Sequence, residues 1–246
     1  AIALKQADCE VVHYQLQEAL DYQIGEDFWE CMTADLDMIW LCNPNNPTGQ
    51  LTDKSFMLKL LERCKALAIR LVVDECFIDF VEEGIGYSVI DQVALHPSLV
   101  VLKAFTKFFG MAGLRLGYAL IGDLKLKSAL EKSAQPWAVS SLAQLAGEVA
   151  LEDTLYSAQT KSLIKLERGY LKQAFERLGF TTYASYADYL FFKSPIPNLH
   201  AKLAEKGILI RHCENYKGLT KDYYRVGIKT HKLNVFLVTK LEELIQ

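Results

Sequence analysis

The sequence predicts an α/β protein with helices packed on a mostly parallel sheet, followed by a smaller α+β region. Continuous apolar runs bounded by turn residues recur in the first half, as in strands buried on both faces. The runs are Met38–Cys42, Leu71–Val73, Leu99–Leu102 and Leu116–Ile121. A polar start at Thr52 and Asp53, followed by apolar residues at helical spacing, predicts a helix over 53–68. Strand, helix and strand in this order form a parallel crossover unit, and such sheets bind ligands at the carboxyl ends of their strands.

The second half alternates helices with short strands, which is typical of an α+β domain. Two long helices are expected over 140–151 and 154–178, with Gly179 as the stop. The shorter elements expected after them are strands over 181–183, 189–193, 208–211 and 223–229 and helices over 198–206 and 231–245. We therefore expect a domain boundary near residue 152, although the long helices run across it.

Composition excludes several classes of protein. The 246 residues carry 27 Lys and Arg against 30 Asp and Glu, without a like-charge block, so nucleic-acid and membrane-surface binding are not expected. Apolar runs stay far short of the roughly 18 residues that span a membrane, and no secretion signal is expected. The six cysteines lack metal-type spacing and are typical of reduced thiols in a cytoplasmic protein. A small-molecule ligand and no metal are expected.

A rigid polar loop follows the first predicted strand. Asn43–Gly49 contains two prolines, three asparagines and a glycine, more than a tight connection needs. Asp74 closes the next strand, where a carboxylate beside buried apolar residues requires a cation or a protonated partner. A structural ion pair would satisfy Asp74 equally well. Both motifs lie where a parallel sheet presents ligand-binding groups.

Basic side chains follow the third predicted strand and lie within the last one. Lys107 stands among aromatic residues, a setting that disfavours its charge and suits Schiff-base chemistry. Arg115 comes after a glycine-spaced turn and could hold a phosphate with two hydrogen bonds. By strand alternation Arg225 and Gly227 face the same way, so the arginine looks into open space and suits a carboxylate. Each basic residue alone could equally be an ordinary surface side chain.

The order and spacing of these motifs resembles the fold-type-I pyridoxal-phosphate (PLP) enzymes of the aspartate aminotransferase superfamily. The motifs are Asn43–Gly49, Asp74–Phe77, Thr106–Gly117 and Tyr224–Val226. Within the superfamily, Gln135–Trp137, Ile210–Leu219 and Phe77 look like the threonine-phosphate decarboxylases of cobalamin biosynthesis. Histidinol-phosphate aminotransferases are the sibling family. The resemblance implies that residues 1–152 belong to a large PLP-binding domain and residues 153–246 form a small substrate domain, in a cytoplasmic homodimer.

The resemblance also implies a role for each site residue. Lys107 would form the Schiff base with PLP and then transfer the proton, and Asp74 would pair with the pyridinium nitrogen. The other implied contacts are Asn46 to the ring oxygen, Thr106 and Arg115 to the cofactor phosphate, Arg225 to the substrate carboxylate and Arg211 to the substrate phosphate. For Arg211, a surface charge at the end of a strand is the competing interpretation.

Three departures from the superfamily pattern bear on cofactor binding. Phe77, which is expected beside the cofactor, stands where aminotransferases usually carry a tyrosine, and its ring cannot donate a hydrogen bond. Ala104 stands where a hydroxyl usually contacts the cofactor phosphate. A glycine-containing phosphate cup, a ring-stacking aromatic and a tyrosine from the neighbouring subunit usually precede the Asn43–Gly49 loop. We expect that this chain begins after them.

The implied reaction is PLP-dependent decarboxylation of L-threonine O-3-phosphate to (R)-1-amino-2-propanol O-2-phosphate. A histidinol-phosphate aminotransferase that transfers the amino group to 2-oxoglutarate stays open, because the choice of reaction depends on how the substrate is oriented. A non-catalytic regulatory domain of aminotransferase ancestry is the third interpretation. A glycine-rich phosphate cup upstream would favour an enzyme, and a winged-helix pattern would favour the regulator.

Overall fold

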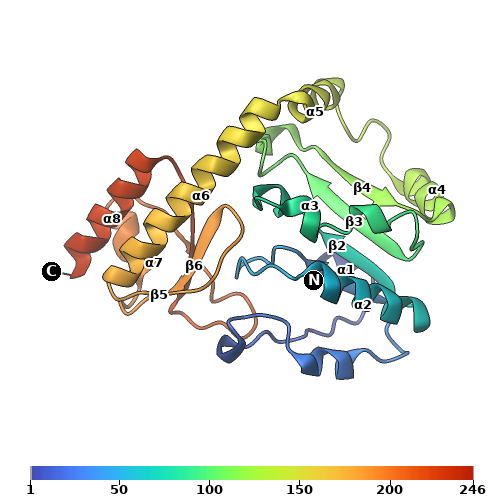
Figure 1. The fold of residues 1–246 in the computed structure, drawn as a ribbon, viewed down its shortest axis with the longest axis horizontal. Helices are drawn as coiled ribbons and strands as arrows, with labels where there is room; N and C mark the ends of the chain where they lie inside the picture. Colours follow the sequence, from blue (N-terminus) through green and yellow to red (C-terminus); the bar gives the residue numbers. More distant parts are fainter. Residues whose placement is uncertain (1, 246) are drawn as a thin grey trace.

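The computed structural model describes residues 2–245 and contains two four-stranded sheets with helices around them (Figure 1). The first sheet has the order β1 (Met38–Cys42), β2 (Arg70–Asp74), β3 (Leu99–Ala104) and β4 (Gly117–Ile121). The first three strands are parallel, and β4 pairs antiparallel with β3. The predicted mostly parallel sheet is confirmed. Its fourth strand reverses because the connection from β3 contains only a single turn of 3-10 helix, too little for a parallel crossover.

One helix crosses over between the first two strands, as the sequence predicts. α2 (Lys54–Ala66) begins after Asp53, whose side chain accepts the Phe56 N–H at 2.8 Å and so caps the helix. Its buried face is formed by Met57, Leu60, Leu61 and Cys64, which pack with the apolar residues of β2 and β3. The other helices before residue 153 are α1 (Ile2–Gln6), α3 (Gly84–Tyr87), α4 (Leu124–Ser133) and α5 (Ser141–Glu152).

The second sheet is antiparallel throughout and has the order β5 (Thr181–Thr182), β6 (Tyr189–Lys193), β8 (Tyr223–Gly227) and β7 (Arg211–His212). The helices beside it are α6 (Thr154–Arg177), α7 (Leu199–Glu205) and α8 (His231–Ile245). Glu167 ties α6 to α8, because its buried carboxylate accepts a hydrogen bond from Asn234 at 2.8 Å. No helix among residues 2–245 is long and apolar enough to cross a membrane.

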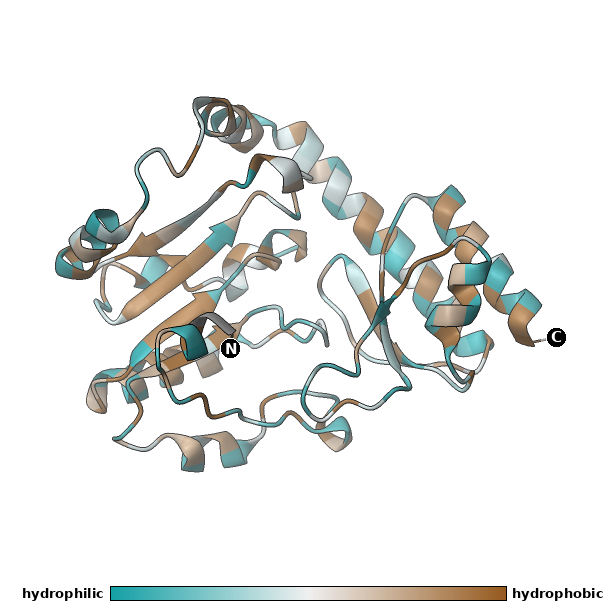
Figure 2. Ribbon diagram, turned by 180° about the vertical axis from the view of Figure 1, so that it is seen from behind, coloured by the Kyte–Doolittle hydropathy of each residue, from teal (hydrophilic) through white to brown (hydrophobic). Residues whose placement is uncertain are grey.

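The long helix α6 runs from the edge of the first sheet across to the second (Figure 1). Its buried residues share one apolar core with β6, β8 and α8, and Phe77, Phe80 and Phe108 from the first half join that core. A separate core fills the space between α2 and the first sheet, whose strands are strongly apolar (Figure 2). On this basis we propose a domain boundary at residue 152. Aromatic residues of the first domain would then hold the second domain in place against the first.

Two strands of the second sheet show why predicted and observed strand ends differ. The strand expected over 208–211 overlaps the observed β7 at Arg211 alone, because the Ile208 N–H still bonds the Leu203 carbonyl at the end of α7. The last strand stops at Gly227, because the Lys229 N–H donates to the side chain of Asn234 instead of to a neighbouring strand.

Candidate active site

The carboxyl ends of the three parallel strands lie side by side and carry the polar motifs. Cys42 is level with Asp74, and Asp74 with Leu102, in the parallel register. The loop after β1, the carboxylate at the end of β2 and Lys107 after β3 therefore leave the sheet at the same edge. This is the edge at which open α/β sheets bind ligands.

The loop after β1 is held rigid by its own side chains. Asn43 is fully buried, and its amide accepts from the Thr52 N–H at 2.9 Å and donates to the Thr52 carbonyl at 3.1 Å. Asn45 donates its amide within the loop at 2.8 Å. Gly49 has a φ of +78°, and a Cβ there would lie 2.3 Å from the Ser185 hydroxyl, so only glycine fits. Of the three asparagines, Asn46 is the one whose side chain bonds to a distant part of the chain.

Asn46, in the first half of the chain, is hydrogen-bonded to two residues of the second half. Its side-chain carbonyl accepts hydrogen bonds from the Arg225 guanidinium on β8 and from the Tyr216 hydroxyl at 3.3 Å. The guanidinium also stacks on Tyr189, with its carbon 4.5 Å from the ring centre. Because the carbonyl of Asn46 is occupied, its NH₂ group remains available as a donor.

Two arginines lie side by side on neighbouring strands of the second sheet. Arg211 on β7 is directly opposite Arg225 in the antiparallel register, so both side chains project from the same face. Arg211 is exposed, donates to the Asn215 side chain at 2.9 Å and lies 5.9 Å above the Tyr216 ring. The structure therefore brings Asn46, Arg225 and Arg211 together.

Two carboxylates, Asp74 and Glu75, lie at the end of β2, and their burial differs from the expectation. Sequence analysis places the buried carboxylate at Asp74, but Asp74 is half-buried and accepts the Cys76 N–H at 3.0 Å. The fully buried carboxylate is Glu75, which accepts the Ser88 hydroxyl at 2.7 Å and the Val89 N–H at 2.9 Å. Burial raises the pKa of Glu75. Glu75 is thus structural, and Asp74 keeps oxygen atoms free for a ligand.

Lys107 is exposed, which differs from the expected apolar setting. Its neighbours Phe105 and Phe108 are buried, whereas Lys107 is exposed, with its Nζ 5.9 Å from the centre of the Phe77 ring. Phe77 in turn packs edge-on against Tyr189 at 5.3 Å. The amine of Lys107 is therefore open to water, and the apolar setting expected to activate it is not found.

The two residues expected at the cofactor phosphate do not join this group. Arg115 is exposed, adopts a left-handed φ of +56° and donates to the Ala112 carbonyl at 3.2 Å. Thr106 is half-buried, next to Lys107 in the chain. Among residues 2–245 neither side chain is hydrogen-bonded to Asn46 or Arg225.

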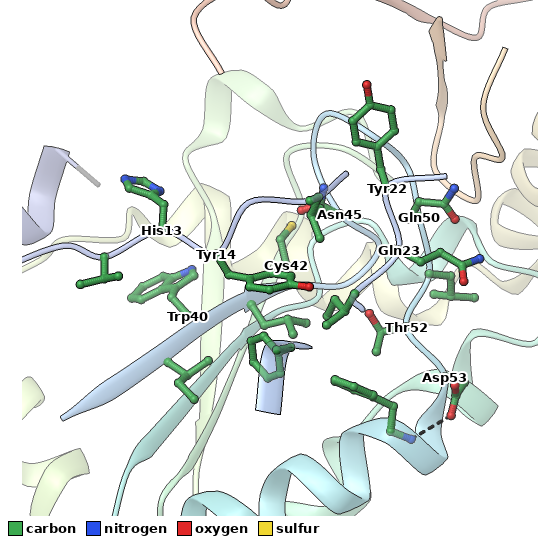
Figure 3. Close-up of a pocket in the computed structure, with 18 residues that line it drawn as sticks. His13, Tyr14, Tyr22, Gln23, Trp40, Cys42, Asn45, Gln50, Thr52 and Asp53 are labelled. Atoms are coloured by element: carbon green, nitrogen blue, oxygen red, sulfur yellow. Dashed lines mark hydrogen bonds between the residues drawn. The ribbon is translucent and has the colours of Figure 1, made fainter. Parts of the chain in front are cut away.

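A separate cavity of about 360 Å³ lies beside β1 (Figure 3). Tyr14 and Trp40 line one part of it, and Asn45 and Gln50 line another. Neither Lys107 nor the arginines border it, so we do not assign the reaction to this cavity. Within the stretch 2–245 no cluster of His, Cys, Asp or Glu has the geometry of a metal site.

Comparison with known proteins identifies the family of this chain. The family model "Aminotransferase class I and II" matches residues 2–238. The chain belongs to the class I and II aminotransferase family. It is 37% identical to the threonine-phosphate decarboxylase of Salmonella typhimurium over 99% of the chain, and it spans 67% of that relative's length.

Solved structures of two histidinol-phosphate aminotransferases have the same fold. The histidinol-phosphate aminotransferase of Clostridium acetobutylicum superposes with a TM-score of 0.93 at 26% identity, over 99% of this chain and 74% of that one. The histidinol-phosphate aminotransferase of Sinorhizobium meliloti, solved in complex with pyridoxal-5'-phosphate, gives 0.73 at 21% identity, over 85% and 57%.

Sequence reasoning overlooked three side chains beside the candidate site, Tyr216, Tyr189 and Asp188. Tyr216 lies in the Ile210–Leu219 stretch that carries the family resemblance, so a closer reading of that stretch would have included it. Tyr189 and Asp188 stand at the start of β6. In the sequence, these two residues are marked only by an aspartate and a tyrosine that precede the apolar residues of the strand.

Proposed function

We propose that this chain is a PLP-dependent carboxy-lyase that converts L-threonine O-3-phosphate to (R)-1-amino-2-propanol O-2-phosphate. The observation that supports it most is the placement of Arg211 directly opposite Arg225. Like charges at such positions repel each other, and an anionic ligand relieves the repulsion. Threonine phosphate offers two anionic groups a few bonds apart, one for each guanidinium.

The residues at the sheet edge fit PLP. Asp74 presents an acceptor without an ion-pair partner among residues 2–245, which suits a protonated ring nitrogen. Asn46 has a free amide donor for the ring oxygen, and Lys107 supplies a primary amine. Arg115 is exposed and would have to give up its bond to the Ala112 carbonyl to hold the phosphate. When bound, PLP accepts the electron pair of the bond that breaks at the substrate's α-carbon.

The protein's own contribution is binding and proton transfer. Arg225 would hold the substrate carboxylate with its position fixed by Asn46 and Tyr189, so little side-chain freedom is lost on binding. Arg211 would hold the phosphate. Lys107 would deliver a proton to the α-carbon after carbon dioxide has left. By resemblance we also propose that the protein works as a cytoplasmic homodimer.

A histidinol-phosphate aminotransferase is the second candidate. The TM-score of 0.93 to such an enzyme favours it. Histidinol phosphate carries a phosphate but no carboxylate, so it would engage one arginine and leave the other for the oxo acid. The two candidates therefore differ in whether both arginines bind one molecule.

The experiment is to incubate the PLP-loaded protein with each substrate and identify the products by mass spectrometry. The proposal requires an aminopropanol phosphate from threonine phosphate without an added oxo acid. Glutamate formed from 2-oxoglutarate and histidinol phosphate, with no aminopropanol phosphate, would establish the aminotransferase instead.

A further inference from the structure

A short segment that precedes the first sheet contacts both halves of the chain. We call residues 17–23 the strap (dark blue in Figure 1); it contains one turn of 3-10 helix over Glu18–Leu20. Asp21 and Tyr22, which follow that turn, have left-handed φ angles of +50° and +57°. Such angles are uncommon for residues other than glycine and persist only where the surroundings fix them. Contacts outside the strap must therefore hold it in this shape.

The first of these contacts is to the loop that carries Asn46. The side-chain amide of Gln50 donates to the backbone carbonyl of Asp21 at 2.6 Å and to its carboxylate at 2.8 Å. Gln50 is buried, and its backbone carbonyl accepts the Asn45 N–H at 2.7 Å. One glutamine therefore ties the strap to the residue that precedes Asn46.

The strap also binds the second sheet, through the carboxylate of Glu18. This carboxylate accepts hydrogen bonds from three donors: the Tyr183 hydroxyl, the Tyr223 hydroxyl at 2.7 Å and Lys193 Nζ at 3.3 Å. Tyr183 follows β5, Lys193 ends β6 and Tyr223 begins β8. The buried Tyr22 ring packs edge-on against Tyr183 at 5.0 Å. A single carboxylate thus joins the strap to three strands.

The strap contacts the face of the second sheet that bears Arg225. Tyr223 and Arg225 are two residues apart on β8, so their side chains project from the same face. Lys193, directly opposite Tyr223 on β6, shares this face. So does Phe191, directly opposite Arg225, and the Tyr22 ring packs edge-on against it at 5.4 Å. The strap therefore lies beside the strand position from which Arg225 projects.

Two routes thus connect β8 to the loop that carries Asn46. One is the hydrogen bond from the Arg225 guanidinium to Asn46 itself. The other runs from Tyr223 through Glu18 and the strap to Gln50. In the proposed function Arg225 also binds the substrate, so its guanidinium is shared between two acceptors. The strap does not use that guanidinium, so it still fixes β8 when a ligand is bound.

We propose that Glu18 is a positioning residue that, through Tyr223 on β8, holds Arg225 where it can bind the substrate carboxylate. Gln50 anchors the strap to the first domain and so gives Glu18 a fixed place. The inference rests on the proposed function for the identity of the ligand, but the hold of Glu18 on the strap is measurable without any substrate.

The first test measures amide hydrogen exchange in the PLP-free protein, by mass spectrometry of peptides that contain residues 17–23. The Tyr22 N–H bonds the Gln17 carbonyl at 2.9 Å, so its exchange reports whether the strap keeps its shape. Glu18→Ala removes the contact to the second sheet, and Gln50→Leu removes the contact to the first domain. Each should speed exchange about fivefold or more.

The second test is a double-mutant cycle on KM for threonine phosphate in the PLP-loaded protein. Glu18→Ala should raise KM about fivefold, while kcat changes by less than about twofold. Glu18→Gln keeps one acceptor oxygen and should give a smaller rise. In the Arg225→Lys background, Glu18→Ala should raise KM no further, because the group that Glu18 positions is already gone.

Glu26→Ala is the control for both tests and should change neither the exchange nor KM, since Glu26 is an exposed carboxylate in the next 3-10 turn. Unchanged exchange in Glu18→Ala would overturn the proposal. So would the same rise in KM in both backgrounds, because Glu18 would then not act through Arg225. If the unmodified protein releases no carbon dioxide from threonine phosphate, the proposed function fails, while the exchange rates still decide whether Glu18 holds the strap.

Discussion

The guanidinium of Arg225 donates a hydrogen bond to the side-chain carbonyl of Asn46, across 179 residues of sequence. The bond joins the central strand β8 of the second sheet to the loop that follows β1 of the first. It orients the amide of Asn46 and the guanidinium of Arg225 at the same time. The proposed cofactor contact and the proposed substrate contact are therefore positioned by each other.

Replacing Arg225 with lysine should weaken substrate binding while leaving the fold intact. A lysine keeps the charge but cannot hold Asn46 and a carboxylate together in one plane. The loss of one charged hydrogen bond, about 1.5–3 kcal/mol, should raise KM for threonine phosphate about tenfold to a hundredfold. Steady-state kinetics measure this. Arg177→Lys, which alters an exposed ion pair to Glu242, is the control and should leave KM unchanged.

Arg211→Gln tests whether its guanidinium recognises the substrate phosphate. The variant should lose preference for threonine phosphate over threonine, because only the phosphorylated substrate uses Arg211. We expect the ratio of kcat/KM values for the two substrates to fall by about tenfold or more. An unchanged ratio would assign Arg211 to the surface, where its bond to Asn215 is sufficient.

Gly49→Ala should destabilise the loop that carries Asn46. The new methyl group would meet the Ser185 hydroxyl at 2.3 Å, and φ is already +78°. We expect a loss of about 1–3 kcal/mol in the free energy of unfolding, measured in urea. Gly169→Ala is the matched control: it lies inside α6 with open space around it, so it should stabilise by about 0.5–1 kcal/mol.

Glu18 gives the protein a pH-dependent contribution to stability. Hydrogen bonds from Tyr183 and Tyr223 lower the pKa of its carboxyl in the folded state. That contribution is complete above the pKa of about 4.3 in the unfolded chain and is lost as pH falls through the lower folded value. Glu18→Gln should therefore cost less than about 1 kcal/mol at pH 7, because the side chain is 44% exposed, and nothing in strong acid. A difference from the unmodified protein that grows toward acid pH would contradict this assignment.

Much of the fold could be predicted because its elements carry strong local patterns. The strand Tyr189–Lys193 and the helix His231–Ile245 were found with the expected limits. The bounds of the short strand β7, expected over 208–211, could not be predicted, since it consists of the two residues that reach β8 and has no periodicity of its own. Such strands are determined by tertiary pairing, which a local pattern does not contain.

The candidate site was predictable in its residue types but not in its contacts. Asn46 and Lys107 follow from motifs at strand ends, and Arg225 follows from the alternation within a strand. Which of three asparagines bonds to a distant part of the chain depends on Asn43 and Asn45 being used inside the loop. The exposure of Lys107 likewise depends on how aromatic neighbours pack, because their rings fill the core and leave the lysine outside it.

The most direct measurement uses threonine phosphate labelled with ¹³C in its carboxyl group, with the PLP-loaded protein and its Lys107→Ala variant side by side. The account predicts one labelled carbon dioxide for each aminopropanol phosphate formed, no requirement for 2-oxoglutarate, and no turnover in the variant. Retention of the label in a keto acid, formed only when 2-oxoglutarate is present, would contradict the account.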